Sequence, residues 1–236
     1  MKKLWLALWV CAALLPRAAA LSAAAAVTMD ADTGETLFAE NADSRLPMAS
    51  TTKIMTALVA LGEGDLDRVY IVKPEYAAVE GSSMYLKAGE TLSLRDTLYG
   101  LMLASGNDAA VAIAGECGGM TAFVGKMNAK AAELGLMDTH FDNPNGLPSD
   151  THYTTAHELA KITAAALKDP VFRQIVSTKS CTVSGHALSN HNRLLSMYDG
   201  AIGVKTGFTR AAGRCLVSAA ERNGRTIIAV TLNDPN

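Results

Sequence analysis

The chain has 236 residues, of which 49% are hydrophobic and 19% charged. These proportions suit one compact domain, or a domain with a subdomain, around a sizeable core. The formal net charge is −2, and no basic run or face is evident, which excludes a typical nucleic-acid-binding protein. Aromatic residues make up only 6%, too few for a platform that stacks single-stranded bases.

The N-terminus has the pattern of a secretory signal peptide. Two lysines precede a twelve-residue apolar run, Leu4 to Leu15, and the small residues Ala18-Ala19-Ala20 follow it. A membrane-spanning helix needs roughly 20 apolar residues, so an uncleaved anchor is the weaker alternative. We expect residues 1–24 to be the signal peptide, with cleavage after Ala20 or Ala24, and the mature protein to work outside the cytoplasm.

Strand patterns lie at both ends of the mature chain. Apolar and polar residues alternate from Ala26, break at Asp32-Thr33-Gly34 and resume, which predicts a β-hairpin. Near the C-terminus the sequence predicts three further strands, the last two joined by the hairpin signal Asn223-Gly224. These strands are expected at residues 200–206, 214–221 and 225–232.

Helical patterns fill the middle of the chain. Apolar residues at helical spacing predict helices over residues 50–61, 93–103, 107–115, 121–134 and 155–167. Thr155 and Glu158 have the spacing of a capping box at the start of the last helix. The expected fold is α+β, with an antiparallel sheet formed by both chain ends, flanked by helices, and a mainly helical subdomain.

Ser50 and Lys53 form an S-x-x-K motif where a helix is expected to begin. Residues three apart share a helix face, so the lysine amine can reach the serine hydroxyl. Serine needs a base to become a nucleophile, and lysine serves only if its pKa falls from ~10.4 towards 7. Burial and a second cation lower a lysine pKa in this way. The motif alone is weak, because about one is expected by chance in a chain of this length.

Two further short motifs are equally weak in isolation. Ser105-Gly106-Asn107 lies between two predicted helices and, alone, is explained by a turn. Lys205-Thr206-Gly207 lies in a predicted strand, where the glycine permits close backbone approach and the lysine offers a second cation. The three motifs together, in this order, are the signature set of penicillin-binding proteins and class A β-lactamases.

The surrounding sequence closely resembles the low-molecular-mass D-alanyl-D-alanine carboxypeptidases of the penicillin-binding-protein/β-lactamase-like superfamily. The resemblance covers nearly all of residues 25–236 and is carried by LPMASTTKIMTAL, EGSSMYLKAGE, LYGLMLASGNDAAVAIA, FDNPNGLP and DGAIGVKTGFTRAAGRCLVSAAER. It implies a serine carboxypeptidase that removes the terminal D-alanine of peptidoglycan stem peptides ending in D-Ala-D-Ala. It also implies covalent binding of β-lactam antibiotics, and no metal or cofactor.

The resemblance assigns a role to each residue of the motifs. Ser50 is implied to be the acylated nucleophile, Lys53 its base and Ser105 a proton shuttle to the leaving amine. Asn107 is implied to hold the substrate backbone. The carboxylate is implied to lie on Lys205 and Thr206, beside Gly207, while the backbone N–H groups of Ser50 and Phe208 form the oxyanion hole.

The sequence departs from the resemblance at its end. It stops after the last predicted strand, without the covering helix and the β-rich domain that relatives often carry. The resemblance implies that such a region, where present, gives the full-length protein a peripheral membrane association. An uncovered sheet would expose apolar residues of RTIIAVTL, and two explanations stay open: a fragment of a longer protein, or a partner that covers the face.

Other classes of function fit less well. A single D-T-G sequence, at Asp32, does not make an aspartic protease, which needs two. His157-Glu158 lacks the second histidine of a zinc peptidase. A class A-like β-lactamase is the nearest enzymatic alternative, but no E-x-x-L-N segment lies between Ser105 and Lys205. The non-enzymatic alternative is a truncated, catalytically silent peptidoglycan-binding module, against which the intact motifs argue. The three mature cysteines have no framework spacing and are expected to be buried, inert thiols.

Overall fold

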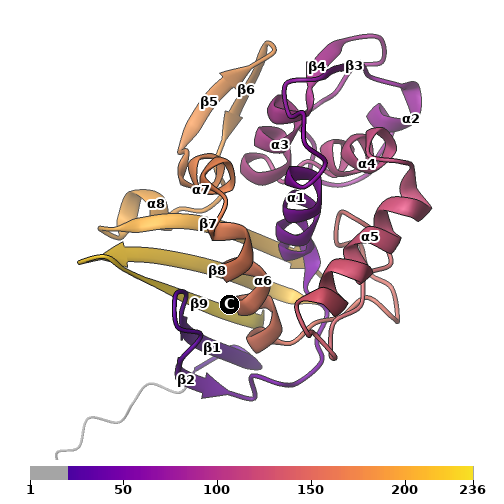
Figure 1. Cartoon of the computed structure of the whole chain (residues 1–236). Coiled ribbons are helices and arrows are strands. Elements are labelled where there is room, and N and C mark those ends of the chain that lie inside the picture. Colours follow the sequence, from indigo (N-terminus) through magenta and orange to yellow (C-terminus); the bar gives the residue numbers. More distant parts are fainter. Residues whose placement is uncertain (1–20, 236) are drawn as a thin grey trace, which may run out of the picture.

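The computed structural model describes residues 21–235, so most of the expected signal peptide lies outside the described residues. One five-stranded sheet has the order β2-β1-β9-β8-β7, with neighbouring strands antiparallel. Its strands are β1 (Ala25–Asp30), β2 (Thr36–Glu40), β7 (Ala201–Thr209), β8 (Gly213–Arg222) and β9 (Arg225–Asp234). The first and last strands pair with each other at its centre, which confirms the predicted sheet formed by both chain ends (Figure 1).

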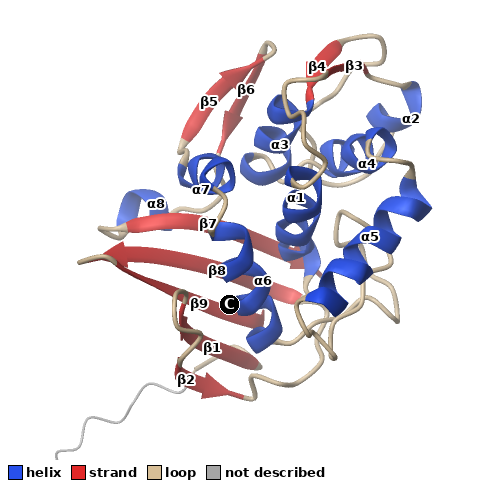
Figure 2. Cartoon of the chain, viewed as in Figure 1, coloured by secondary structure: helices blue, strands red, loops and turns tan. Residues whose placement is uncertain are grey.

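Helices cover one face of this sheet and form a lobe beside it (Figure 2). The helices are α1 (Lys53–Leu61), α2 (Pro74–Ala77), α3 (Leu94–Leu103), α4 (Asn107–Glu116), α5 (Met120–Glu133), α6 (Ala156–Leu167), α7 (Pro170–Ser177) and α8 (Leu194–Met197). Helix α6 contacts β1 and β9, and α7 contacts β7. Helix α1 contacts α3, α4, α5, α6 and α7 and so joins the lobe to the sheet layer.

The position of α1 follows from its sequence, KIMTALVAL, which is apolar on nearly every side. A helix of that kind is stable only when other elements surround it. Ile54, Met55, Ala57 and Ala60 are all buried. A 3-10 turn, Ala49–Thr52, precedes α1 and contacts β7, the edge strand of the sheet. Burial of α1 therefore places Ser50 where the helical lobe meets the edge of the sheet.

Local signals were correct in some places and incomplete in others. Asn223 and Gly224 both have positive φ, as the predicted two-residue hairpin requires. The Thr155 hydroxyl accepts from the Glu158 N–H as predicted, but the Glu158 carboxylate binds Met137, Asp138 and Thr139 instead of returning to the cap. The two-stranded sheets β3–β4 (Val69–Ile71, Thr91–Ser93) and β5–β6 (Ser180–Val183, His186–Ser189) were not predicted.

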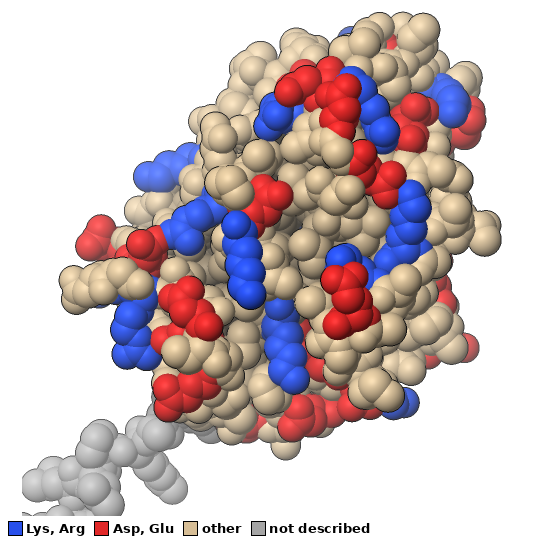
Figure 3. Space-filling model, in the orientation of Figure 1, with Lys and Arg blue, Asp and Glu red and all other residues tan. Residues whose placement is uncertain are grey.

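The outer face of the sheet carries an apolar hollow in the described part of the protein. Ile227 and Ala229 of β9 line a cavity of about 470 Å³ together with Leu194 and Tyr198. Both β9 residues are half-buried, so the expected exposure of this strand is partial. On the face drawn in Figure 3, Lys and Arg alternate with Asp and Glu and form no continuous patch of one sign. Within residues 21–235 we find no helix with the length and apolar character needed to span a bilayer.

Candidate active site

Lys53 lies at the centre of the polar cluster that the S-x-x-K spacing predicts. Its Nζ is 2.9 Å from the Ser50 Oγ, 2.8 Å from the Asn107 Oδ1 and 2.7 Å from the Asn145 carbonyl oxygen. The Lys53 side chain is fully buried, whereas Ser50 is half-buried and borders an open cavity. The lysine is therefore withdrawn from solvent while the serine stays accessible.

These three contacts fix the direction of the lysine lone pair when the amine is uncharged. The oxygens of Asn107 and Asn145 can only accept hydrogen bonds, so each takes one N–H of the amine. A neutral amine has two N–H bonds and one lone pair, and the third neighbour is the Ser50 hydroxyl. The lone pair therefore faces the proton that has to leave the serine.

Electrostatics favour the uncharged amine. Burial lowers the pKa of Lys53 well below its usual value, and the positive charge of Lys205 lowers it further. The carboxylate of Asp108 acts in the opposite direction. Lys205 is buried as well, and desolvation lowers its pKa to about 7. Its Nζ donates to the Thr206 carbonyl oxygen at 2.9 Å.

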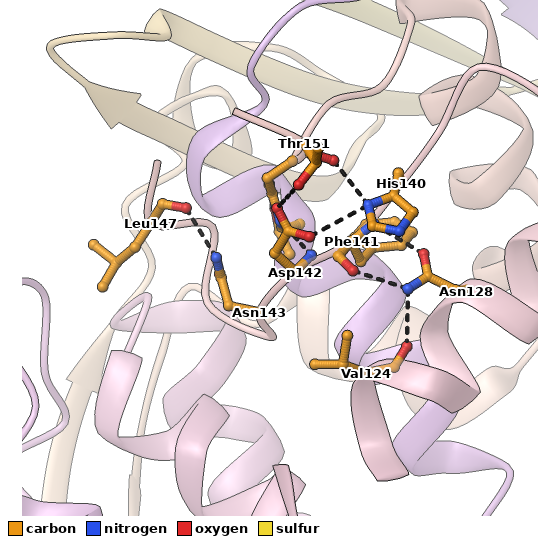
Figure 4. Close-up of polar contacts among 10 residues, drawn as sticks. Val124, Asn128, His140, Phe141, Asp142, Asn143, Leu147 and Thr151 are labelled. Atoms are coloured by element: carbon orange, nitrogen blue, oxygen red, sulfur yellow. Dashed lines mark hydrogen bonds and ion pairs between the residues drawn. The ribbon is translucent and has the colours of Figure 1, made fainter. Parts of the chain in front are cut away.

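The Asn145 carbonyl is delivered by the loop of residues 140–151, drawn in Figure 4. The Asn128 amide of α5 donates to the Phe141 carbonyl oxygen and accepts from the Phe141 N–H. The Asn143 amide donates to the Leu147 carbonyl oxygen and closes the tip of the loop. These bonds hold the Asn145 carbonyl oxygen in place, although the segment around it is neither helix nor strand.

Gly146 allows the loop tip to approach the nucleophile. Its φ is +88°, and a Cβ at this position would lie 2.0 Å from the Ala49 carbonyl oxygen and 2.9 Å from the Ser50 nitrogen. Such distances exclude any side chain. The glycine is therefore required both by its conformation and by the space available.

Two non-glycine residues at the site have left-handed backbone conformations. Ala49, directly before the nucleophile, has φ of +48°, and Ser105 has φ of +59°. Such conformations cost about 1–3 kcal/mol each and persist where the surrounding structure enforces them. They lie at the start of the nucleophilic turn and at the break between α3 and α4, and they set where both serines lie.

The edge strand β7 forms the other wall of the site. A cavity of about 520 Å³ is lined by Ser50, Ser82, Ser105, His191, Thr206, Gly207, Phe208, Arg214, Cys215, Leu216, Thr231 and Asp234. A Cβ on Gly207 would lie 3.0 Å from the Ser50 nitrogen, so β7 passes directly beside that N–H group. The backbone of Ser50 and the backbone of β7 at residues 207–208 therefore border the same cavity.

The structure brings together the residues selected from the three motifs. Ser50, Ser105, Thr206, Gly207 and Phe208 line the cavity, while Lys53, Asn107 and Lys205 lie buried behind it. The Asn107 amide, which was expected to hold the substrate backbone, is engaged on both sides, by Lys53 and by the Glu80 carbonyl oxygen at 2.7 Å. Sequence reasoning missed Asn145, which acts through a backbone oxygen that carries no side-chain signature.

Metal-binding groups are not gathered in the part of the chain that the structure describes, where no three His, Cys, Asp or Glu side chains form a site for an ion. Cys117, Cys181 and Cys215 are free thiols. Two of them are buried as expected, but Cys181 is only half-buried. Cys215 lines the cavity, and desolvation raises its pKa, which disfavours the reactive thiolate.

Comparison with known proteins gives consistent matches. A family model described as Peptidase S11, D-alanyl-D-alanine carboxypeptidase, matches residues 12–236. The D-alanyl-D-alanine carboxypeptidase of Streptomyces sp. strain K15 is 40% identical over 235 residues, covering 90% of this chain and 81% of the relative. DacB2 of Mycobacterium tuberculosis is 40% identical and is covered to 72%, whereas DacF of Bacillus subtilis is covered to only 56%. The crystal structure of the Streptomyces K15 DD-transpeptidase superposes with a TM-score of 0.87 at 38% identity, covering 92% of each chain.

Proposed function

The chain belongs to the Peptidase S11 family of D-alanyl-D-alanine carboxypeptidases, and we propose that Ser50 is its acylated nucleophile and Lys53 the base that activates it. The observation that carries this proposal is the contact between the Lys53 Nζ and the Ser50 Oγ, with both other neighbours of the amine being acceptors. The family is one of penicillin-binding serine peptidases that act on D-Ala-D-Ala ends.

The first step is acylation. Lys53 takes the Ser50 proton, and the serine oxygen attacks the carbonyl carbon of the penultimate D-alanine. The negative charge on the former carbonyl oxygen is met by the backbone N–H groups of Ser50 and Phe208, each worth about 2.7–4 kcal/mol if it acts as a typical oxyanion donor. The C–N bond then breaks, and Ser105 relays the proton that Lys53 took to the amine of the departing D-alanine, which leaves Lys53 uncharged for the second step.

The second step is hydrolysis of the acyl-enzyme. Water gives its proton to Lys53 and attacks the ester carbon, after which the Ser50 oxygen leaves and takes the proton back. The shortened peptide departs with a new carboxylate. An amine acceptor in place of water would make the same step a transpeptidation. A β-lactam enters by the first step but keeps its leaving group attached through the opened ring.

Substrate recognition is assigned to the edge strand. We place the terminal carboxylate of the peptide on the Thr206 hydroxyl, beside the buried Lys205. The incoming negative charge raises the Lys205 pKa from about 7, so its amine meets the carboxylate as an ammonium. Gly207 leaves the strand backbone open to the peptide. Asn107 is assigned to Lys53, and contact of its amide with the substrate backbone requires exchange of one of its present partners.

The site of action is proposed from the N-terminal pattern and from the family. A basic start, a twelve-residue apolar run and small residues predict export by a signal peptide, and peptidoglycan lies outside the cytoplasmic membrane. We therefore infer an extracytoplasmic enzyme of the cell wall. Peripheral membrane association of the full-length protein is part of this proposal, and fractionation of cells that express the complete gene product tests it.

Intact mass spectrometry with benzylpenicillin tests the nucleophile. The wild type is expected to gain one penicilloyl group, and Ser50→Ala none. Ser44→Ala is the matched control, because Ser44 is exposed, lies six residues upstream and should leave labelling unchanged. A label that persists in Ser50→Ala would contradict the proposal. Release of D-alanine from a peptide ending in D-Ala-D-Ala, with a long-lived penicillin adduct, supports the peptidase, whereas rapid turnover of the adduct supports a β-lactamase.

A further inference from the structure

Asp108 is a buried carboxylate at the edge of the site that the mechanism above does not use. It lies next to Asn107 in the first turn of α4 and is 1% exposed. Its oxygens accept hydrogen bonds from the Ser83 hydroxyl at 2.5 Å, from the Met84 and Leu86 N–H groups at 3.1 Å each, and from the Ala109 N–H at 2.9 Å. Three of these four donors belong to one segment, residues 80–87.

This segment, which we call the wall loop, borders the cavity that β7 also lines. Its Ser82 lines the cavity together with Ser50 and Ser105. The wall loop contains no helix or strand, and Tyr85 within it has φ of +66°. Backbone groups that regular structure would pair must find other partners. In the wall loop, the Asp108 carboxylate supplies part of that pairing.

The wall loop also touches the catalytic cluster directly. The Asn107 N–H donates to the Ser82 carbonyl oxygen at 2.7 Å, and the Asn107 amide donates to the Glu80 carbonyl oxygen at 2.7 Å. The same amide accepts from the Lys53 Nζ. A shift of the wall loop would therefore move the acceptor that orients the Lys53 amine.

We propose that Asp108 is a positioning residue for acyl transfer: it clamps the wall loop onto α4, and so fixes both the Ser82 side of the substrate cavity and the Asn107 amide that orients Lys53. This inference rests on the proposed roles of Ser50 and Lys53. A displacement of about 1 Å at a reacting group can cost a hundredfold in rate, so a clamp of this kind has a measurable effect.

Asp108 has a second, separable effect on the reaction through its charge. The charged groups that act on Lys53 are Lys205 from β7, which lowers its pKa, and Asp108 from α4, which raises it. Removing the carboxylate charge therefore lowers the Lys53 pKa. The acid limb of the acylation rate, where Lys53 becomes protonated, then moves to lower pH. Loss of packing alone would not move that limb.

Asp30 offers a matched control elsewhere in the fold. It too is a buried carboxylate that holds an irregular segment, through the Asp32 and Thr33 N–H groups at 3.0 and 3.1 Å. Neither Asp30 nor the turn that it holds lines the cavity. Asp108→Asn and Asp30→Asn thus make the same change, one at the site and one away from it.

The test measures acylation by a fluorescent penicillin from pH 5 to pH 9, at a temperature where circular dichroism shows each variant folded. Asp108→Asn is expected to acylate about ten- to a hundredfold more slowly at pH 7, with its acid limb at lower pH. Asp30→Asn should lose stability but acylate within about twofold of the wild type. If Asp108→Asn acylates like the wild type, loses no more rate than Asp30→Asn, or keeps the wild-type acid limb, the inference is overturned.

A second variant covers the case in which Asp108→Asn does not fold. Ser83→Ala removes one bond of the clamp and keeps the charge, so it should slow acylation severalfold and leave the acid limb in place. An unchanged rate in Ser83→Ala would overturn the inference. A wild type that takes up no penicillin at all would instead refute the proposed function, so the two failures are distinguishable.

Discussion

Replacing Lys205 with methionine should stabilise the protein at neutral pH while removing its activity. Burial lowers the Lys205 pKa to about 7, against about 10.4 in an unfolded chain. Between these values the unfolded chain binds the proton and the folded chain does not, so stability increases as the pH rises through this window. At about 1.4 kcal/mol per pH unit, the buried lysine costs about 4 kcal/mol of folding free energy at pH 7.

The variant recovers this folding free energy only in part. Methionine keeps the apolar stem but leaves the Thr206 carbonyl oxygen without its donor, which costs about 1–3 kcal/mol. We therefore expect Lys205→Met to be more stable than the wild type by about 1–3 kcal/mol at pH 7. The advantage should shrink, and then reverse, towards pH 10. Acylation by penicillin should fall about a hundredfold, because the substrate carboxylate loses its cation and the Lys53 pKa rises.

Urea unfolding at pH 7 and at pH 9.5 measures the gain in stability and its decrease at high pH. Taking the difference in unfolding free energy between variant and wild type cancels the contribution of groups that titrate in both proteins. Lys161→Met is the control, since Lys161 is an exposed lysine of α6, and its difference should be small at both pH values. A Lys205→Met protein that is less stable than the wild type by the same amount at both pH values would refute the reasoning. So would a variant that acylates at the wild-type rate.

Three further predictions follow from single contacts. Gly146→Ala should reduce acylation more than a hundredfold, because its Cβ would overlap the Ala49 carbonyl oxygen; a normal stopped-flow rate would contradict this. Asn107→Asp places a carboxylate beside the Lys53 amine and raises its pKa, so acylation at pH 7 should fall and recover as the pH rises; a parallel loss at all pH values would count against it. Asp30 has its pKa lowered to about 2 by an arginine partner, so thermal scans should show its stabilisation lost between pH 4 and pH 2, and absent in Asp30→Asn.

Much of the site was predictable because its geometry is local. The three-residue spacing of Ser50 and Lys53 places both on one face once a helical turn forms, and the distance of 2.9 Å between Lys53 Nζ and Ser50 Oγ agrees with that spacing. The hairpin patterns at both chain ends likewise predicted β1, β2, β8 and β9, because alternation and a two-residue turn are properties of adjacent residues. The assignment of the motifs to one site came from the resemblance to a known family.

The rest depends on contacts between distant segments. The Asn145 carbonyl contacts Lys53 although the two residues are 92 positions apart. The residues around Asn145 do not indicate where its carbonyl oxygen will lie. The same holds for Glu158. The predicted bond from its N–H to the Thr155 hydroxyl is present, but its carboxylate binds residues 137–139 instead of the backbone N–H of Thr155. The two-stranded sheets β3–β4 and β5–β6 have only three or four residues per strand, too few for a clear alternation.

The protonation state of Lys53 can be measured directly by ¹⁵N NMR of its side-chain nitrogen, assigned by comparison with Lys53→Arg and followed from pH 5 to pH 11. A folded protein in which this nitrogen titrates well below the usual pKa of a lysine is the expected result. An ammonium signal that persists to pH 10, in a wild type that still acylates, would show that another group removes the serine proton.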